Sequence, residues 1–228
     1  MEIRDATQLE KAKLEDTLVE ILYHKYKDLV FHGGTAIWRC YSGNRFSRDL
    51  DFYLNAKTAR EKTEYYRKFS EFLIEYGFAV KEKGYDNSTD TMHFLVESVA
   101  KMKIDINFKY KRGIPVEYLK VDDSKIVILS LSPLELLSEK IIAYNDRLNN
   151  KKKYTQSEVQ DLYDIYYLVS LVKNGTTVIA KHLELLVNLI EETPPRNVKS
   201  LGHLILAGVP PSFELMIKRI KEWIDDNN

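Results

Sequence analysis

The stretch FHGGTAIWRCYSGNRFSRDLDFYL, residues 31–54, constrains the fold of this chain more than any other. It joins the pair Gly33-Gly34 to two aspartates, Asp49 and Asp51, within a run that otherwise resembles a β-strand. Strands are depleted in aspartate, so the carboxylates either lie on a solvated edge or bind something cationic. A strand, a glycine turn and a helix N-terminus favour binding, because free N–H groups attract anions and glycine lets a phosphate approach closely.

The alternation of side chains along a strand places Asp49 and Asp51 on one face, with Leu50 and Phe52 on the other. Two such carboxylates stand about 6–7 Å apart at Cα. Their oxygens are suited to Mg²⁺, which retains waters that a phosphate can replace, and a carboxylate pair can bridge two ions. The pattern therefore predicts a site for one or two Mg²⁺ ions beside a phosphate.

A third carboxylate, Asp105, lies in the run KMKIDINFKY at residues 101–110. Alternation places Asp105 on the face opposite the apolar residues of that run. If this strand neighbours the Asp-x-Asp strand, Asp105 completes a triad, as a metal ligand or as the base for an attacking hydroxyl. The alternative is an ordinary solvated strand face.

Hydrophobic periodicity outlines the remaining elements. Helical spacing predicts a helix over residues 6–27 and another over 58–77. Period-two alternation predicts further strands in FAVKEK, TMHFLVESV, KMKIDINFKY and KIVILS. From Pro133 onward only helices are predicted, over 133–149, 156–173, 177–191 and 211–226. We therefore expect an α+β fold, with an α/β domain over residues 1–131 and a helical domain over 132–228.

Composition excludes several classes of protein. The 228 residues include 34 basic and 34 acidic side chains, so net charge gives no argument for a nucleic-acid or membrane partner. The single cysteine, Cys40, excludes an internal disulfide framework and a cysteine-based zinc site. No apolar run approaches the roughly 20 residues of a membrane span, and the N-terminus lacks the apolar core of a signal peptide. We expect a cytoplasmic protein without membrane association.

The helical part contains one pattern of basic residues and one pattern of acidic residues. Lys140, Tyr144 and Arg147 share one helix face. A lysine and an arginine together suit a triphosphate, although a solvated helix face is the simpler explanation. In QDLYDIYYL, Asp161 and Asp164 lie among apolar and tyrosine residues. Carboxylates in such surroundings need partners, which Lys140 or Arg147 would provide.

These motifs resemble those of a known family. HGGTAIWRC…NRFSRDLDF is similar to the signature of the polymerase-β-like nucleotidyltransferase superfamily, and GGTA through RFSRDLDF resembles the AbiEii family of nucleotidyltransferase toxins from bacterial and archaeal toxin–antitoxin systems. EKIIAYNDR resembles the lysine-containing helix of that family and QDLYDIYYL its aspartate-containing helix. The resemblance covers about residues 30–170. Because Gln160 stands where a basic residue is common, either Asp161 or Asp164 is the matching aspartate.

The resemblance implies a small mixed sheet with flanking helices, a helical second lobe, and transfer of a nucleoside monophosphate from an NTP with release of pyrophosphate. The acceptor in such proteins is typically the 3′ end of tRNA, and a cognate antitoxin protein is a possible partner. It implies that Asp49 and Asp51, and in our interpretation Asp105, hold Mg²⁺. The residues expected to act in catalysis are Asp49, Asp51, Lys140 and Asp161. Those expected to bind substrate are Gly33, Gly34, Thr35, Arg45, Ser47, Arg147 and Asp164.

Two rival functions use the same residues. The carboxylates also suit a metal-dependent nuclease or phosphodiesterase, and a non-catalytic module would bind a nucleotide or a partner without turnover. A nucleic-acid acceptor requires local positive charge, because phosphate neutralisation supplies most non-specific affinity. Arg45 and Arg48 beside the aspartates, and the lysines of residues 151–153, are the candidates.

Overall fold

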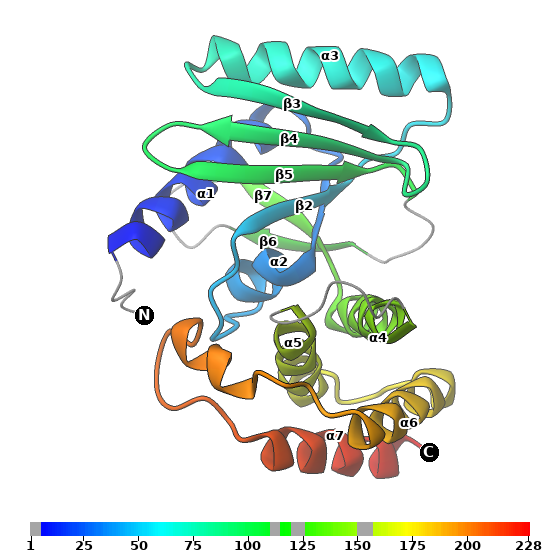
Figure 1. Cartoon of the computed structure of the whole chain (residues 1–228). Coiled ribbons are helices and arrows are strands. Elements are labelled where there is room, and N and C mark those ends of the chain that lie inside the picture. Colours follow the sequence, from blue (N-terminus) through cyan, green and yellow to red (C-terminus); the bar gives the residue numbers. More distant parts are fainter. Residues whose placement is uncertain (1–5, 110–114, 120–125, 150–156) are drawn as a thin grey trace. The chain divides into compact units, whose positions relative to one another are not determined.

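The structure, a computed structural model, describes residues 6–109, 115–119, 126–149 and 157–228 (Figure 1). The chain divides into two compact units. The sheet unit comprises Met1–Ser42 and Phe46–Ser132, and the helical unit comprises Gly43–Arg45 and Pro133–Asn228. The short segment Gly43–Arg45 thus belongs to the helical unit, although it lies between elements of the sheet unit in the sequence.

The sheet unit is built on a mixed sheet. Seven strands are described, in the order β3-β4-β5-β2-β1-β7-β6. The pairs β1–β7 and β2–β5 are parallel and the other neighbours are antiparallel. The strands are β1 (Val30–His32), β2 (Asp49–Tyr53), β3 (Ala79–Asp86), β4 (Thr91–Glu97), β5 (Lys101–Asn107), β6 (Pro115–Leu119) and β7 (Val127–Leu131).

Three helices accompany the sheet: α1 (Ala6–Lys25), α2 (Gly33–Cys40) and α3 (Ala59–Glu75), of which α3 lies along β3 (Figure 1). The first turn of α3 carries a capping box, in which Thr58 and Glu61 each accept a hydrogen bond from the backbone N–H of the other. Apolar side chains of α1 and α3 form one core with the apolar face of the strands. Burying each large apolar side chain contributes about 1.5–3 kcal/mol, so this core fixes which strand face is left for polar groups. The mixed sheet with flanking helices confirms the predicted fold class.

One strand, β6, escaped the sequence analysis. It begins at Pro115 and pairs only with β7, at the edge of the sheet described here. Proline has no N–H for a strand ladder and is confined to edge strands or to the first residue of a strand. Pro115 satisfies both conditions, so a proline is compatible with the strand that begins there.

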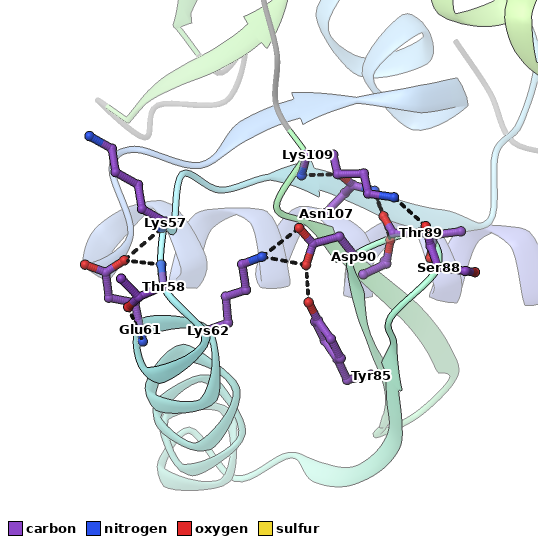
Figure 2. A network of polar contacts seen from close by, with 11 residues as sticks. Lys57, Thr58, Glu61, Lys62, Tyr85, Ser88, Thr89, Asp90, Asn107 and Lys109 are labelled. Carbon is purple, nitrogen blue, oxygen red and sulfur yellow. Dashed lines mark hydrogen bonds and ion pairs between the residues drawn. The ribbon is translucent and has the colours of Figure 1, made fainter.

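A polar network fastens the turn between β3 and β4 to α3 and β5 (Figure 2). The ammonium of Lys62 in α3 lies 2.7 Å from the carboxylate of Asp90, which also accepts a hydrogen bond from the hydroxyl of Tyr85. The side-chain amide of Asn107, at the end of β5, donates to the carbonyl of Thr89 over 3.0 Å. The network therefore holds β4 and β5 in register at the end of the sheet where β5 terminates.

The helical unit contains the four helices that periodicity predicted, together with one short 3₁₀ helix that it did not. They are α4 (Pro133–Asn149), α5 (Ser157–Leu171), α6 (Thr177–Glu192), η1 (Val198–His203) and α7 (Phe213–Asn227). The indole N–H of Trp223 in α7 donates to the carbonyl of Val172 over 2.6 Å, and Asn227 accepts from the backbone N–H of Gly175. These bonds attach the end of α7 to the turn between α5 and α6. In the described parts of the chain, no helix combines the length and the apolar character that crossing a membrane requires.

Candidate active site

The start of α2 lies against the carboxylate of Asp51. Strand β1 ends at His32 and α2 begins at Gly33, whose φ of +73° disfavours other residues. A Cβ atom on Gly33 would lie 2.4 Å from Oδ2 of Asp51, so a side chain cannot fit there. The first N–H groups of a helix have no partner within the helix. The turn therefore presents backbone donors immediately beside a carboxylate.

Strand β2 exposes its two aspartates as predicted. Leu50 and Phe52 are fully buried, Asp51 is partly exposed and Asp49 is exposed. Thr35, expected in the phosphate-binding turn, is fully buried, and its hydroxyl donates to the backbone carbonyl of Asp49 over 2.6 Å. The side chain of Thr35 thus attaches α2 to the beginning of β2. A phosphate contact by its backbone N–H stays a prediction.

The third carboxylate lies where the sequence analysis placed it. Strands β2 and β5 are parallel neighbours, and Asp51 is paired with Asp105 in the ladder. Directly paired residues of adjacent strands point to the same side, and their strands run about 4.8 Å apart. The expected adjacency of the two strands is therefore confirmed, whereas a role for Asp105 as ligand or base stays a prediction.

A row of polar residues crosses four strands at this level. His32, Asp51, Asp105 and His93 are successive partners on β1, β2, β5 and β4. Asp105 is held from two sides, with Nδ1 of His93 2.8 Å from Oδ1 and the Lys103 ammonium 2.6 Å from Oδ2. Alternation alone places His93 on a polar strand face, but only the strand order shows that this face is the one carrying Asp51.

Lys103 partly neutralises this carboxylate cluster. Burial lowers the pKa of Lys103, but the hydrogen bond to Asp105 and the negative charges of Asp105, Asp49 and Asp51 outweigh burial and raise it. The ammonium of Lys103 therefore stays charged at neutral pH. Three carboxylates thus act together on one cation, and an excess of carboxylates over cations is the electrostatic condition for binding a divalent metal ion.

The donor set fits a magnesium ion that shares its coordination with a phosphate. Within the described residues, no group of three or more His, Cys, Asp or Glu side chains is arranged to hold a metal ion by itself. Mg²⁺ is usually held by one or two carboxylates together with waters and substrate phosphates, rather than by a complete protein cage. Asp49 and Asp51 supply such a pair, and the Asp51 carboxylate lies against Gly33 at the start of α2, where a metal ion on Asp51 would be next to the backbone N–H groups of the helix.

A buried carboxylate near this site was missed by the sequence analysis. Glu15 in α1 is fully buried, and neither of its oxygens has a hydrogen-bond partner among the described residues. Burial raises its pKa to about 8, which the charges of Arg39 and Lys11 oppose and that of Asp49 supports. The signal was available, because Glu15 shares the apolar face of α1 with Leu18 and Leu22.

Replacing Glu15 with glutamine should change how stability depends on pH. A glutamate ionises near pH 4.3 in the unfolded chain and near pH 8 in the folded one. Between these values the folded state retains a proton that the unfolded state has lost, so the wild type loses stability as pH rises and levels off above pH 8. The free energy of unfolding should be measured with urea at pH 5 and at pH 8. Between these two pH values, the difference between Glu15→Gln and the wild type should shift by about 3–5 kcal/mol in favour of the variant. A difference that is the same at both pH values would contradict the assignment.

The helical unit brings together the other predicted residues. Arg45 forms two hydrogen bonds with Asp164, at 2.8 and 2.7 Å. Lys140 lies 2.8 Å from both Asp161 and Asp164, and Arg147 lies 2.6 Å from Asp161. Lysine and arginine therefore serve as the partners that the two carboxylates were expected to need.

This ion network is largely shielded from solvent. The side chains of Arg45 and Asp164 are 6% and 2% exposed, while Arg147 at 33% is the most accessible member. Burial would raise the pKa of Asp164, but the charges of Arg45 and Lys140 overcome it and hold that pKa below its usual range. Lys140 is likewise held charged, because the attraction of Asp161 and Asp164 outweighs burial and raises its pKa. Arg45, Lys140 and Asp164 therefore carry their charges at neutral pH.

The remaining predicted residues contribute less to this description. Ser47 is partly exposed and Arg48 is exposed, directly before Asp49 in the chain. The lysines of residues 151–153 lie outside the described residues. The site residues thus form one group in the sheet unit, around Asp51, and another in the helical unit, around Asp161 and Asp164.

Solved structures share this fold. A proposed nucleotidyltransferase from H. pylori matches with a TM-score of 0.67 at 15% identity, over 97% of this chain and 94% of that one. JHP933 from Helicobacter pylori matches with a TM-score of 0.64 at 16% identity, over 97% and 91% of the two chains. At such low identity the likeness shows the fold alone. This chain therefore has the same fold as these two structures, a mixed sheet with flanking helices followed by further helices.

The family follows from the sequence itself. A profile of the family described as "Nucleotidyl transferase AbiEii toxin, Type IV TA system" matches residues 18–213, which is most of the chain. A search of curated proteins gave no match. The chain belongs to the AbiEii family, whose members are nucleotidyltransferase toxins of type IV toxin–antitoxin systems. The resemblance noted in the motifs is thereby confirmed.

Proposed function

We propose that this protein transfers a nucleoside monophosphate from an NTP to the 3′ hydroxyl of an RNA, with tRNA the expected acceptor, in a reaction that depends on Mg²⁺. The observation that carries the chemistry is the position of the Asp51 carboxylate against the start of α2, with Asp105 paired to it on the neighbouring strand. Phosphoryl transfer needs a cation between carboxylate and phosphate, and it needs backbone donors for the outer phosphates.

In this proposal the chain's own residues mainly position the reactants. Gly33 and Gly34 offer backbone N–H groups to the β- and γ-phosphates. The acceptor oxygen forms a bond to the α-phosphorus while the bond from that phosphorus to the bridging oxygen breaks, and pyrophosphate leaves. Asp105 is the third carboxylate within reach, as a further ligand or as the group that receives the hydroxyl proton. When bound to Asp49 and Asp51, Mg²⁺ supplies positive charge to the phosphate oxygens and orients them.

Incubation with each labelled NTP, Mg²⁺ and total tRNA tests the proposal. Label on the RNA, lost on addition of EDTA, is the expected result. Shortened RNA without label would favour a metal-dependent nuclease instead, and tight NTP binding without turnover would favour a non-catalytic module. Expression with and without the neighbouring genes would show whether a cognate antitoxin protein, which we include in the proposal, suppresses toxicity.

Lys140 provides a separate prediction about NTP binding. Lys140→Met leaves Asp164 paired with Arg45, and Asp161 paired with Arg147, so no buried carboxylate loses its last partner. If the ammonium contacts a phosphate, as the family resemblance implies, NTP affinity should fall by about 1.5–3 kcal/mol, the value of a charge-assisted hydrogen bond. Isothermal titration with a non-hydrolysable NTP measures this difference.

A matched control is Lys181→Met, which removes an exposed lysine from α6. It should leave NTP affinity unchanged, because an exposed charge away from the ligand is screened by solvent and salt. Equal NTP affinity in the Lys140→Met variant and the wild type would restrict Lys140 to its ion pairs with Asp161 and Asp164.

A further inference from the structure

The helical unit contains a pocket lined with tyrosines that the proposed chemistry does not use. It has a volume of about 600 Å³ and lies between α5 and α7, which pack on each other (Figure 1). This volume is within the range of small-ligand sites, about 300–1,000 Å³. The lining residues are Asn44, Tyr163, Tyr166, Tyr167, Ser170, Leu215, Lys218, Arg219 and Glu222.

The aromatic side of the pocket comes from one face of α5. Tyr166 and Tyr167 are half-buried, so each keeps part of its ring accessible while its position is fixed by packing. Tyr163 behind them is almost fully buried, and its ring centre lies 5.9 Å from that of Tyr166. Stacking on aromatic rings is how proteins bind single-stranded nucleic acid without regard to sequence, because every base has a π face.

The charged side of the pocket comes from α7. Lys218 and Arg219 are largely exposed, and their only described partner is Glu222, at 4.0 and 3.3 Å. Exposed pairs of this kind contribute about 0–1 kcal/mol, so a phosphate can readily replace the carboxylate as partner. With two cations and one carboxylate, this side of the pocket has a net positive charge. It therefore attracts an anionic nucleic-acid strand and repels a polycationic acceptor.

The pocket is also connected by a short segment to the predicted metal-binding strand. The side-chain amide of Asn44 is fixed by two hydrogen bonds to the backbone of Ala207, at 2.7 and 3.0 Å. Only five residues of chain lead from Asn44 to Asp49, and five residues span at most about 18 Å. This wall of the pocket and the predicted metal-binding strand are therefore joined by a short covalent segment.

We infer that this pocket binds unpaired nucleotides of the acceptor RNA, with bases on Tyr166 and Tyr167 and phosphates on Lys218 and Arg219. The inference rests on the proposed function for the identity of the acceptor. It assigns to the helical unit a subsite for the acceptor strand, separate from the site of the NTP.

The test is RNA binding by the full-length chain, measured as the fluorescence anisotropy of a short labelled single-stranded RNA. Tyr166→Leu and Tyr167→Leu should each weaken binding by roughly 5- to 150-fold, the effect of losing one stacked base. Tyr166→Phe and Tyr167→Phe keep the ring and should stay within about twofold of the wild type. A duplex RNA of the same sequence should compete poorly, because its bases cannot stack on the tyrosines.

A second set of variants tests the phosphate contacts proposed for the cations on α7. Lys218→Gln with Arg219→Gln should reduce RNA affinity and flatten its dependence on salt by about one unit of slope for each lost phosphate contact. The matched control is Lys221→Gln, on the same helix but outside the pocket and paired with Glu191 at 2.7 Å. It should bind RNA like the wild type, and no variant should alter affinity for a fluorescent NTP.

Unchanged RNA affinity in the folded Tyr→Leu variants would overturn the inference. A loss of NTP affinity instead of RNA affinity would overturn it too, by giving the pocket to the incoming nucleotide. The proposed function fails separately: if the wild type transfers no label to RNA but the leucine variants lose RNA binding, only the acceptor chemistry is wrong. If label is transferred and the variants bind RNA normally, only the pocket assignment is wrong.

Discussion

Asp51→Asn should reduce nucleotidyl transfer by at least about a thousandfold. The carboxylate of Asp51 lies beside the start of α2 and next to Asp105, so its charge is needed where metal and phosphate meet. Metal-ion catalysis contributes several kcal/mol of charge stabilisation, and each 1.4 kcal/mol corresponds to a factor of ten in rate. Asparagine keeps the shape of the side chain but binds a divalent ion poorly. Single-turnover transfer of label from an NTP to RNA measures the effect, and Asp49→Asn should behave alike.

The folded structure should survive this substitution. Asp51 is only partly buried and lies on the same face of the sheet as Asp49 and Asp105. Removing one of these charges therefore relieves repulsion between carboxylates. The melting temperature should therefore stay unchanged or rise. Asp86→Asn is the matched control, since it removes a carboxylate from the far edge strand β3 and should leave transfer intact. Normal transfer combined with lower stability in Asp51→Asn would instead make the aspartate pair structural.

Periodicity was sufficient to predict the faces of the strands around this site. The alternation in DLDFYL placed Asp49 and Asp51 opposite Leu50 and Phe52, and the structure buries both of these apolar side chains completely. Alternation depends only on local backbone geometry, so it is available in the sequence. The same holds for Asp105, which lies opposite three buried apolar residues of β5.

The arrangement of these faces across the sheet was not available in the sequence. The row from Asp51 through Asp105 to His93 depends on the order of β2, β5 and β4, and strand order is decided by packing between residues far apart in the chain. Glu15 was missed for another reason. Its helical position was predictable, but glutamate is almost never fully buried without a partner, so the apolar pattern around it concealed it.

The segment Gly43–Arg45 shows a third limit of sequence reasoning. Arg45 is expected to bind substrate, and that role stays a prediction; the structure adds that its guanidinium donates to Asp164 of α5, within the helical unit. No local pattern indicates a partner 119 residues away. The resemblance to the family brought Arg45 and Asp164 to attention, but only the coordinates pair them.

Asp164→Ala should destabilise the helical unit by about 3–5 kcal/mol, the largest loss of stability that we expect from a single replacement. Asp164 is 2% exposed and neutralises Arg45, which is 6% exposed, over two hydrogen bonds. Removing it takes away the carboxylate that accepts two hydrogen bonds from a buried guanidinium, and breaking a buried pair from one side costs about this much. A carboxylate whose folded pKa is depressed stabilises the fold above its unfolded pKa. The difference from the wild type should therefore persist at neutral pH and shrink as pH falls below about 4.

The measurement can be restricted to the helical unit. The chain has two tryptophans, Trp38 in α2 and Trp223 in α7, so a Trp38→Phe background leaves Trp223 as the reporter during urea unfolding. Asp225→Ala, an exposed change on α7 in the same unit, is the control and should alter stability by no more than about 0.5 kcal/mol. An equally small effect of Asp164→Ala would show that Arg45 finds other partners and that its pair with Asp164 does not stabilise the helical unit.

Replacing both partners separates charge from packing. A variant carrying Arg45→Met and Asp164→Leu removes the buried pair while filling its volume, and exchanging a buried ion pair for apolar side chains is often neutral or stabilising. We expect this variant to regain most of the stability lost in Asp164→Ala, while Lys140 keeps Asp161 as its partner at 2.8 Å. If this double variant also transfers label as the wild type does, the pair only attaches residues 43–45 to the helical unit. If stability returns without activity, Arg45 and Asp164 are needed for the reaction as charges, as the family resemblance implies for substrate binding.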